Sequence, residues 1–395
     1  MNILVLTKVY PASDLSQEET PVVHYFVKEW IKMGLNVKVI VNYPIFPKIV
    51  SWGIRRFEKC VATLMGSIPP RYCKALHYEH EGVDVYRFPM LKYIPHGSYS
   101  DLAIRKQEQL IIETLDDCHF VPDVIVAHWW HPHLELLPRF KALYNCKTCM
   151  VVHDIGLRNG NKKYINCFSQ IDVWGMRSLP LKNAFERIVG SGHKIFHCTS
   201  GIPEKYIVGN SKRNFDTQVL SVCFVGGLIK RKNPVAILDA IIDNQLSFIS
   251  EVVYIGNGAE RKKLEKKANM YFKDGCVKCL GRLSRDGVSQ RLKNADIFVM
   301  ISKAEAFGLV YLEAMGAGCI TIASRNEGMD GIIIDGVNGY LCNAGDSTEL
   351  ANILKRIQKL SPAERKKISN AAVETARENT DYLAAKKYLD AVVGA

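Results

Sequence analysis

Short apolar runs alternate with amphipathic stretches along the first half of the chain. We expect strands where an apolar run is brief and nearly continuous, and helices where apolar residues recur every three to four positions. The expected strands are 2–8, 36–42, 123–127, 148–153 and 194–198, and the expected helices are 21–33, 101–117, 131–143 and 181–189. Buried strands separated by helices predict a parallel sheet that is covered on both faces.

The same alternation restarts in the second half, after a polar stretch at 200–218 with little periodicity. The expected strands are 222–225, 252–255, 277–280, 296–301, 320–323 and 340–342, and the expected helices are 234–246, 260–271, 285–294, 308–315, 348–360 and two more beyond residue 361. Two such series predict an α/β chain with two doubly wound domains, 1–200 and 218–377. We expect the final helix, about 378–395, to pack back on the first domain, and ligands to bind in a cleft at the carboxyl ends of the strands.

Composition narrows the class of protein. The chain has 395 residues and a formal net charge of +12, which is spread over both halves. An even spread of charge argues against a nucleic-acid partner. We instead expect a protein that handles phosphates and rests against an anionic membrane surface. No apolar run approaches the roughly 20 residues that span a bilayer, and the first residues resemble a buried strand, so we expect a cytoplasmic protein, peripheral on the inner face of the membrane. Two Cys-x-x-Cys pairs, Cys146/Cys149 and Cys276/Cys279, lie too far apart to predict a zinc site.

The most informative segment is 302–318. A predicted strand ends before Glu305, and Gly308 begins a helix that carries Glu313. The backbone N–H groups of Gly308, Leu309 and Val310 would form an anion site at the start of this helix. Glu313 lies five residues further on, about 7 Å along the axis, which is roughly the offset between a diphosphate and a ribose. The alternative is an exposed loop glutamate beside an ordinary amphipathic helix.

The segment resembles the Glu-x7-Glu motif of glycosyltransferase family four, whose members are retaining enzymes of the two-domain GT-B fold. The flanking runs 296–302, 316–323, 327–328 and 335–341 are also similar to that family. The resemblance implies that Glu305 binds the hydroxyls of the donor sugar and is a catalytic residue, and that Glu313 binds the ribose. It also implies that Lys232 holds the diphosphate, while Gly227 stands where the family has an arginine. Either Lys230 or Arg231 would substitute for that arginine, or the phosphates would rely more on backbone donors.

Histidines in the first half extend the resemblance. His128 resembles a strand-end histidine that faces the donor sugar, and we take it as a second catalytic candidate, followed by His131. His153 and Asp154, at the end of the next expected strand, resemble a further cleft-facing pair, and we assign them and His131 to the acceptor side. The alternative for these histidines is a buried, hydrogen-bonded side chain. The loop 8–20 lacks the glycine pair that the family often has there.

The predicted activity is transfer of a sugar from a UDP-sugar to a saccharide or lipid-linked saccharide in surface polysaccharide or glycoconjugate synthesis. The resemblance implies a front-face path, in which a phosphate oxygen takes the proton of the acceptor hydroxyl. No Asp-x-Asp metal clamp is present, so we expect neither a metal nor a cofactor. The segment 49–59, basic and aromatic, is compatible with a membrane contact or with an exposed helix. A nucleotide-sugar epimerase of the same fold and a non-catalytic nucleotide-sugar-binding module are the alternatives, and the incomplete Gly-x-Gly pattern at Gly256–Gly258 disfavours a dehydrogenase.

Overall fold

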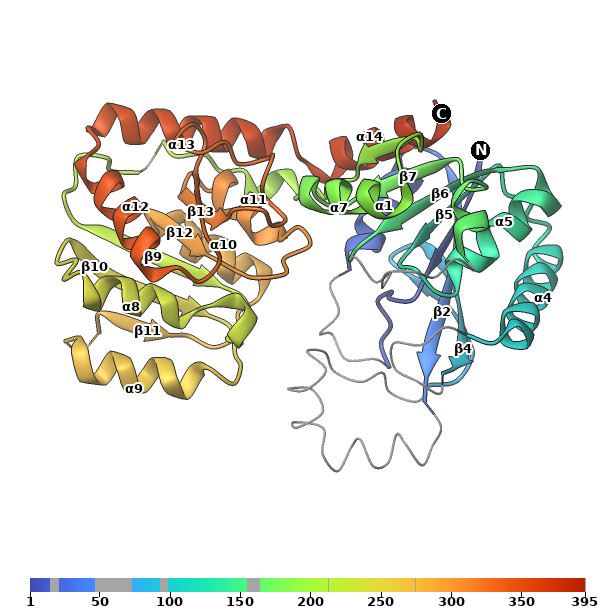
Figure 1. Ribbon diagram of the computed structural model, residues 1–395, viewed down its shortest axis with the longest axis horizontal. Coiled ribbons are helices and arrows are strands. Elements are labelled where there is room, and N and C mark those ends of the chain that lie inside the picture. Colours follow the sequence, from blue (N-terminus) through green and yellow to red (C-terminus); the bar gives the residue numbers. More distant parts are fainter. Residues whose placement is uncertain are drawn as a thin grey trace. The chain divides into compact units, whose positions relative to one another are not determined.

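A computed structural model describes residues 1–14, 21–46, 73–92, 99–154, 164–211, 213–273 and 275–394 (Figure 1). The chain divides into two compact units, which are treated separately below. Unit 1 comprises Met1–Met176, Leu181–Cys198 and Ala385–Ala395, and unit 2 comprises Arg177–Pro180 and Thr199–Ala384. The division after Cys198 lies close to the expected domain boundary at residue 200.

Unit 1 contains an eight-stranded sheet in the order β3-β4-β2-β1-β5-β6-β7-β8. Its strands are β1 (Asn2–Thr7), β2 (Asn36–Ile45), β3 (Leu76–His80), β4 (Val83–Leu91), β5 (Val124–His128), β6 (Lys147–Val152), β7 (Val173–Met176) and β8 (Ile195–His197). All neighbouring strands are parallel except β3 and β4. The parallel, doubly wound arrangement confirms the prediction of an α/β domain.

The hairpin of β3 and β4 and the short strand β7 were not predicted. β3 is a mostly exposed edge strand of polar composition. In β4, the side chain of Arg87 is buried, and its guanidinium donates two hydrogen bonds to the Asp14 carboxylate (2.8 and 2.6 Å). Between the strands, Glu81 and Gly82 both adopt positive φ (49° and 80°), as a two-residue hairpin turn requires. Gly82 was the available sequence signal for this turn.

Helices cover both faces of this sheet. They are α1 (Val22–Lys32), α4 (Asp101–Asp117), α5 (His133–Tyr144), α6 (Ile165–Phe168), α7 (Leu179–Val189) and the last part of α14 (Asp381–Val393). Apolar residues of α4, α5 and α7 share one core with alternate positions of the strands. Against the other face, Trp30 of α1 packs edge-on to Tyr388 of α14, at 5.0 Å between ring centroids, and donates a hydrogen bond to the carbonyl of Ala385 (2.9 Å). Residues 385–394 of α14 therefore belong to the core of unit 1.

Unit 2 contains a six-stranded, wholly parallel sheet in the order β11-β10-β9-β12-β13-β14. The strands are β9 (Leu220–Val225), β10 (Ile249–Ile255), β11 (Val277–Cys279), β12 (Ile297–Met300), β13 (Ile320–Ser324) and β14 (Tyr340–Cys342). The helices are α8 (Val235–Asp243), α9 (Arg261–Tyr271), α10 (Arg285–Asn294), α11 (Leu309–Gly316), α12 (Ser347–Lys359) and α13 (Pro362–Arg377), with 3-10 turns η2 (Glu204–Tyr206) and η3 (Lys230–Lys232). α8 lies beside α9 and α12, and α11 lies beside α10 and α13. Each predicted strand and helix of this unit is present.

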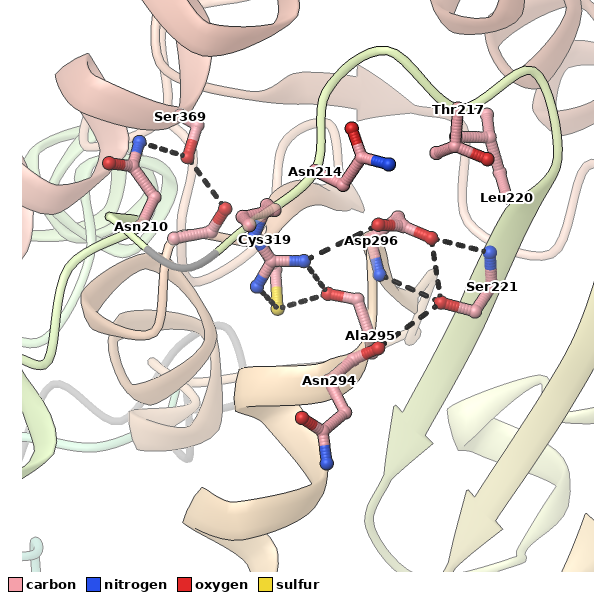
Figure 2. A network of polar contacts seen from close by, with 12 residues as sticks. Asn210, Asn214, Thr217, Leu220, Ser221, Asn294, Ala295, Asp296, Cys319 and Ser369 are labelled. Carbon is pink, nitrogen blue, oxygen red and sulfur yellow. Dashed lines mark hydrogen bonds and ion pairs between the residues drawn. The ribbon is translucent and has the colours of Figure 1, made fainter.

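A polar network fixes the beginning of the central strands of unit 2 (Figure 2). The Asp296 carboxylate, just before β12, accepts hydrogen bonds from the backbone N–H and the hydroxyl of Ser221 on β9 (2.9 and 2.8 Å). The nearly buried guanidinium of Arg213 faces the other oxygen of Asp296 at 3.6 Å and donates to the carbonyls of Ala295 and Ala317. This network lies at the amino ends of the strands and leaves their carboxyl ends for a ligand.

None of the described helices is both long and apolar enough to cross a membrane. The segment 49–59, for which a membrane contact or an exposed helix was predicted, lies outside the described residues. That prediction is therefore untested.

Candidate functional site

The loop between β12 and α11 has a conformation that its glycine makes possible. Gly308, the residue before α11, has φ +85°, in the left-handed region that glycine adopts without strain. A Cβ at this position would lie 2.5 Å from the ring of Tyr311. That ring cannot easily move, because it is buried and its hydroxyl donates to the carbonyl of Met300 (2.6 Å). Glu305 thus precedes the N-terminus of α11, and Leu309, Val310 and Glu313 lie within the helix.

The structure brings together Glu305 and Lys232, which are 73 positions apart in the chain. Their side chains form an ion pair and are only 12% and 13% exposed. Burial lowers the pKa of Lys232 below that of a free lysine, and the charge of Glu305 opposes this shift. Lys232 ends η3, and the next residue, Asn233, donates its side-chain amide to the carbonyl of Ile301 (2.8 Å). η3 is thereby attached to the end of β12, next to the Glu305 loop.

The other two sequence candidates near η3 are exposed. The backbone carbonyl of Arg231 accepts a hydrogen bond from the N–H of Lys303 (2.6 Å), and its guanidinium donates to the carbonyl of Ala304 (3.4 Å). Gly227 is exposed. The atom nearest to a Cβ at this position would belong to the Ile229 side chain, at 3.8 Å, which is an ordinary van der Waals distance. Space alone therefore does not require a glycine at 227.

Glu313 also has a cationic partner, which sequence reasoning missed. The Nε of Arg285, the first residue of α10, donates to the Glu313 carboxylate at 2.6 Å. The same guanidinium lies 4.9 Å from the ring centroid of Tyr206. The Glu313 side chain is 11% exposed, close to the value for Glu305. Two largely buried carboxylates thus bracket the start of α11, and each is balanced by one cation.

A third glutamate holds the Glu305 loop in place. The Glu327 carboxylate accepts hydrogen bonds from the backbone N–H groups of Ala304 (2.9 Å) and Glu305 (2.7 Å). Ala304 has φ +57°, which costs a residue with a side chain free energy, so these bonds support a strained position. Gly328 lies against the loop as well, because a Cβ there would be 2.6 Å from the backbone of Phe307. Residues 327–328, one of the flanking runs that resemble the family, thus contact the loop that carries Glu305.

The Gly256–Gly258 pattern has a packing explanation. A Cβ at Gly256 would lie 1.9 Å from the carbonyl oxygen of Gly226, and one at Gly258 would lie 2.3 Å from that of Leu228. The two loops that follow β9 and β10 therefore approach each other by their backbones. This accounts for both glycines without a dinucleotide.

In unit 1, the structure brings His128 and His153 together at the ends of β5 and β6. Nδ1 of His128 lies 3.0 Å from Nε2 of His153, and its Nε2 lies 3.4 Å from the hydroxyl of Tyr388. His128 is fully buried, whereas His153 is half-buried and stacks on Trp129 at 4.1 Å between ring centroids. Of this histidine pair, the ring with exposed surface is therefore that of His153.

The remaining acceptor-side candidates are more peripheral. His131 is half-buried, and its Nδ1 lies 2.8 and 3.0 Å from the two carboxylate oxygens of Glu135 on α5. Asp154 is exposed, and its backbone carbonyl accepts a hydrogen bond from the indole of Trp130 (2.9 Å). The side chain of His131 thus contacts Glu135 of α5 through Nδ1.

Two lysines at the same edge of the sheet were not predicted. Lys8 directly follows β1, and its Nζ lies 5.7 Å from the ring centroid of Trp129. Lys92 directly follows β4, and its Nζ lies 5.5 Å from the ring centroid of Tyr99. Burial, together with the charge of Lys8, lowers the pKa of Lys92 to about 8. Both lysines thus mark the edge of the sheet at which parallel folds bind ligands.

Comparison with known families finds a match in the second half of the chain. Residues 210–375 match the family model described as "Glycosyl transferases group 1". An uncharacterized glycosyltransferase of Methanocaldococcus jannaschii is 33% identical over 129 residues, which are 32% of this chain and 35% of that protein. The amylovoran biosynthesis glycosyltransferase AmsK of Erwinia amylovora is 29% identical over 263 residues, 60% of this chain and 62% of that protein.

The chain thus spans about a third of the first of these relatives and less than two thirds of the second. A crystal structure of Anabaena HepE in complex with UDP superposes with a TM-score of 0.68 at 16% identity, covering all of both chains. At this identity the likeness concerns the fold, and it confirms the predicted GT-B architecture. Residues 210–375 are thus similar to the group 1 glycosyl transferases, while the narrower assignment to family four stays a prediction.

Proposed function

We propose that the protein is a retaining glycosyltransferase that moves a sugar from a UDP-sugar to a saccharide or lipid-linked saccharide acceptor. One observation carries the proposal. Glu305 and Glu313 lie before and after the first turn of α11, and both side chains are largely buried. Glu305 is paired with Lys232, and Glu313 with Arg285. A surface loop and an ordinary amphipathic helix would not need two buried charges, because burying a charge is costly unless it is paired. The match of residues 210–375 to the group 1 glycosyl transferases supports the same conclusion.

The proposed roles of the residues follow from their positions. The backbone N–H groups of Leu309 and Val310 and the ammonium of Lys232 bind the diphosphate, since a helix N-terminus and a lysine both favour anions. Glu313 binds the ribose hydroxyls. Glu305 binds hydroxyls of the transferred sugar, once the diphosphate has drawn Lys232 away from it. The exposed Arg231 provides a further positive charge for the diphosphate.

In this proposal the diphosphate leaves without a metal ion or cofactor. Its developing charge is stabilised by Lys232 and by the first turn of α11, and losing one such preorganised contact typically costs about 3 kcal/mol of activation free energy. The acceptor hydroxyl attacks from the side on which the diphosphate leaves, and a phosphate oxygen takes its proton. UDP as the nucleotide is supported by the HepE structure, which is a complex with UDP, and a polysaccharide pathway is supported by the similarity to the amylovoran biosynthesis glycosyltransferase AmsK.

We assign the acceptor side to unit 1. His128 and His153 provide imidazoles at adjacent strand ends, with His131 and Asp154 nearby in sequence. Lys8 and Lys92 add positive charge at the same edge, which would suit an acceptor that carries a phosphate or carboxylate. A cytoplasmic location at an anionic membrane surface, with a contact through residues 49–59, completes the proposal for a lipid-linked acceptor.

The central test is the variant Glu305→Gln, which keeps the shape of the side chain and removes its charge. The wild-type protein is incubated with a panel of nucleotide sugars, with and without lipid extracts, and release of nucleotide and labelled product is followed. We expect transfer by Glu305→Gln to fall at least about 100-fold, while the urea unfolding midpoint and the affinity for UDP, measured by calorimetry, stay within about threefold of wild type. Glu265→Gln is the matched control, because that glutamate pairs with Arg261 on the exposed side of α9.

Near-normal transfer by Glu305→Gln would remove the site assignment. The same experiment separates the other candidate activities. An epimerase would convert the donor sugar without any acceptor, and a non-catalytic binding module would bind UDP yet never release it from a donor. Dependence of nucleotide release on an added acceptor supports a transferase.

A further inference from the structure

A cluster of two histidines and a glutamate in unit 1 lies outside the site described above. Within the described residues, His24, His80 and Glu81 each offer one ligand atom, and these three atoms all lie within 4.8 Å of one another. His24 is in the first turn of α1, His80 ends β3, and Glu81 is the first residue of the hairpin turn to β4. Two segments distant in sequence, the start of α1 and the turn between β3 and β4, thus direct metal-ligating groups to one point.

The spacing of these atoms is close to that around a tetrahedral ion. Nε2 of His24 lies 3.4 Å from Oε2 of Glu81. Ligands about 2.0–2.2 Å from a tetrahedral Zn²⁺ are separated by roughly 3.3–3.5 Å, so this pair needs little movement. The ring of His80 is centred 4.7 Å from that of His24 and is only half-buried, so a small rotation brings its nitrogen within range.

The other nitrogen of His24 is already oriented. The hydroxyl of Tyr10 lies 2.9 Å from Nδ1 of His24, and both side chains are buried. A hydroxyl can accept as well as donate, so it can receive the Nδ1–H of the tautomer whose Nε2 lone pair faces the cluster. Ligating histidines commonly have such a partner, which fixes their ring orientation. This contact distinguishes His24 from a histidine that merely lies near a carboxylate.

We propose that His24, His80 and Glu81 form a binding site for a divalent transition metal ion, with Zn²⁺ as the preferred ion. Two imidazoles and one carboxylate are ligands that Zn²⁺ accepts, and the exposed side of Glu81 leaves room for a fourth ligand from water. The ion joins the β3–β4 hairpin to α1. This site is independent of the proposed transfer reaction.

Lys28 provides a sharp test of the proposal. Its ammonium forms an ion pair with the same carboxylate oxygen of Glu81 that faces His24. A metal ion must displace this ammonium, so Lys28→Met removes a competing cation and a source of repulsion. We expect Lys28→Met to bind Zn²⁺ several-fold more tightly than wild type. If the cluster were only a polar network, the substitution would leave metal affinity unchanged or lower it.

The experiment uses the full chain after treatment with a chelator, titrated with Zn²⁺ alone by calorimetry. We expect one equivalent to bind, and His80→Gln and Glu81→Gln each to weaken binding at least about tenfold. These two variants carry the test because His80 is only half-buried and Glu81 is exposed, whereas a change at the buried His24 would also disturb the fold. His77→Gln is the matched control, because His77 lies on the same strand and pairs with a different carboxylate, that of Asp84.

A Co²⁺ titration identifies the ligand type, since the chain also contains 12 cysteines. We expect a visible spectrum without the near-ultraviolet charge-transfer band of a thiolate ligand. Absence of saturable Zn²⁺ binding, equal effects of His77→Gln and His80→Gln, or a thiolate band that persists in His80→Gln would each overturn the proposal.

Discussion

Glu327 controls the position of Glu305 through two hydrogen bonds, and Glu327→Ala would remove both. Hydrogen bonds to a charged group contribute about 1.5–3 kcal/mol each. The loop is partly exposed, so hydrogen bonds to water would replace part of this contribution. We therefore expect the free energy of unfolding to fall by about 1–3 kcal/mol in total. Ala304 then no longer has the support that offsets its left-handed conformation, which costs about 1–2 kcal/mol. The loop would sample other conformations, and Glu305 would move with it.

The effect on the reaction should exceed the effect on stability. A displacement of about 1 Å in a positioned group can reduce a rate roughly 100-fold. We therefore expect Glu327→Ala to lower the kcat for the nucleotide sugar that the wild-type protein uses by about that factor, with a smaller change in KM. Urea unfolding monitored by fluorescence gives the change in stability, and nucleotide release gives the rate.

Glu349→Ala is the matched control for this experiment. The Glu349 carboxylate also accepts one backbone N–H, that of Asn343 (2.7 Å), and one guanidinium N–H, that of Arg325 (3.3 Å), but it belongs to α12. We expect a comparable loss of stability with little loss of turnover. Wild-type turnover in Glu327→Ala, or an equal loss of turnover in the control, would refute a positioning role.

Three further predictions concern other parts of the fold. Arg213→Met removes the guanidinium that contacts the Asp296 carboxylate and the carbonyls of Ala295 and Ala317, so we expect the free energy of unfolding in urea to fall by about 3–5 kcal/mol. A decrease below about 1 kcal/mol would contradict this prediction. Gly308→Ala forces a Cβ against Tyr311 at positive φ, so UDP affinity measured by calorimetry should fall at least about tenfold; unchanged affinity would separate this turn from nucleotide binding. The pKa of Lys92 is lowered to about 8 from 10.5, so its ammonium destabilises the fold below pH 8 and this effect disappears as the pH rises toward 10.5. Lys92→Met should therefore be more stable than wild type at pH 7 and equal to it near pH 11 in urea titrations; an advantage that grows with pH would contradict the sign.

Burial explains which elements the sequence predicts well. β12 and β13 are buried along their whole length, and their apolar runs can be recognised without any neighbour. β4 is different, because Arg87 interrupts its apolar pattern and becomes acceptable only through Asp14, 73 positions away in the chain. β3 is a polar edge strand and carries almost no hydrophobic signal. A sequence pattern reports burial, so strands whose burial depends on a distant partner are missed.

The candidate site was predictable to the same limited extent. Glu305, Glu313 and Lys232 follow from local motifs, since each lies beside a recognisable strand end or helix start. The motifs do not say that Lys232 and Glu305 form an ion pair, nor that Arg285 balances Glu313. Those pairings depend on α10, α11 and η3 meeting at one edge of the sheet. Charge balance at a buried site is a property of the fold, and no spacing within one segment encodes it.

The carboxylates and His128 differ in how directly each can act on a ligand. Each glutamate is balanced by a cation that a negatively charged diphosphate would attract, so binding of the donor would itself free Glu305 for sugar hydroxyls. His128 is fully buried between His153 and Tyr388, and a direct sugar contact would require its ring to leave one of them. His153, by contrast, is only half-buried. Within the proposed function, this difference favours a positioning role for His128, whose Nδ1 lies 3.0 Å from Nε2 of His153, and leaves His153, which directly follows β6, as the ring with the greater exposure.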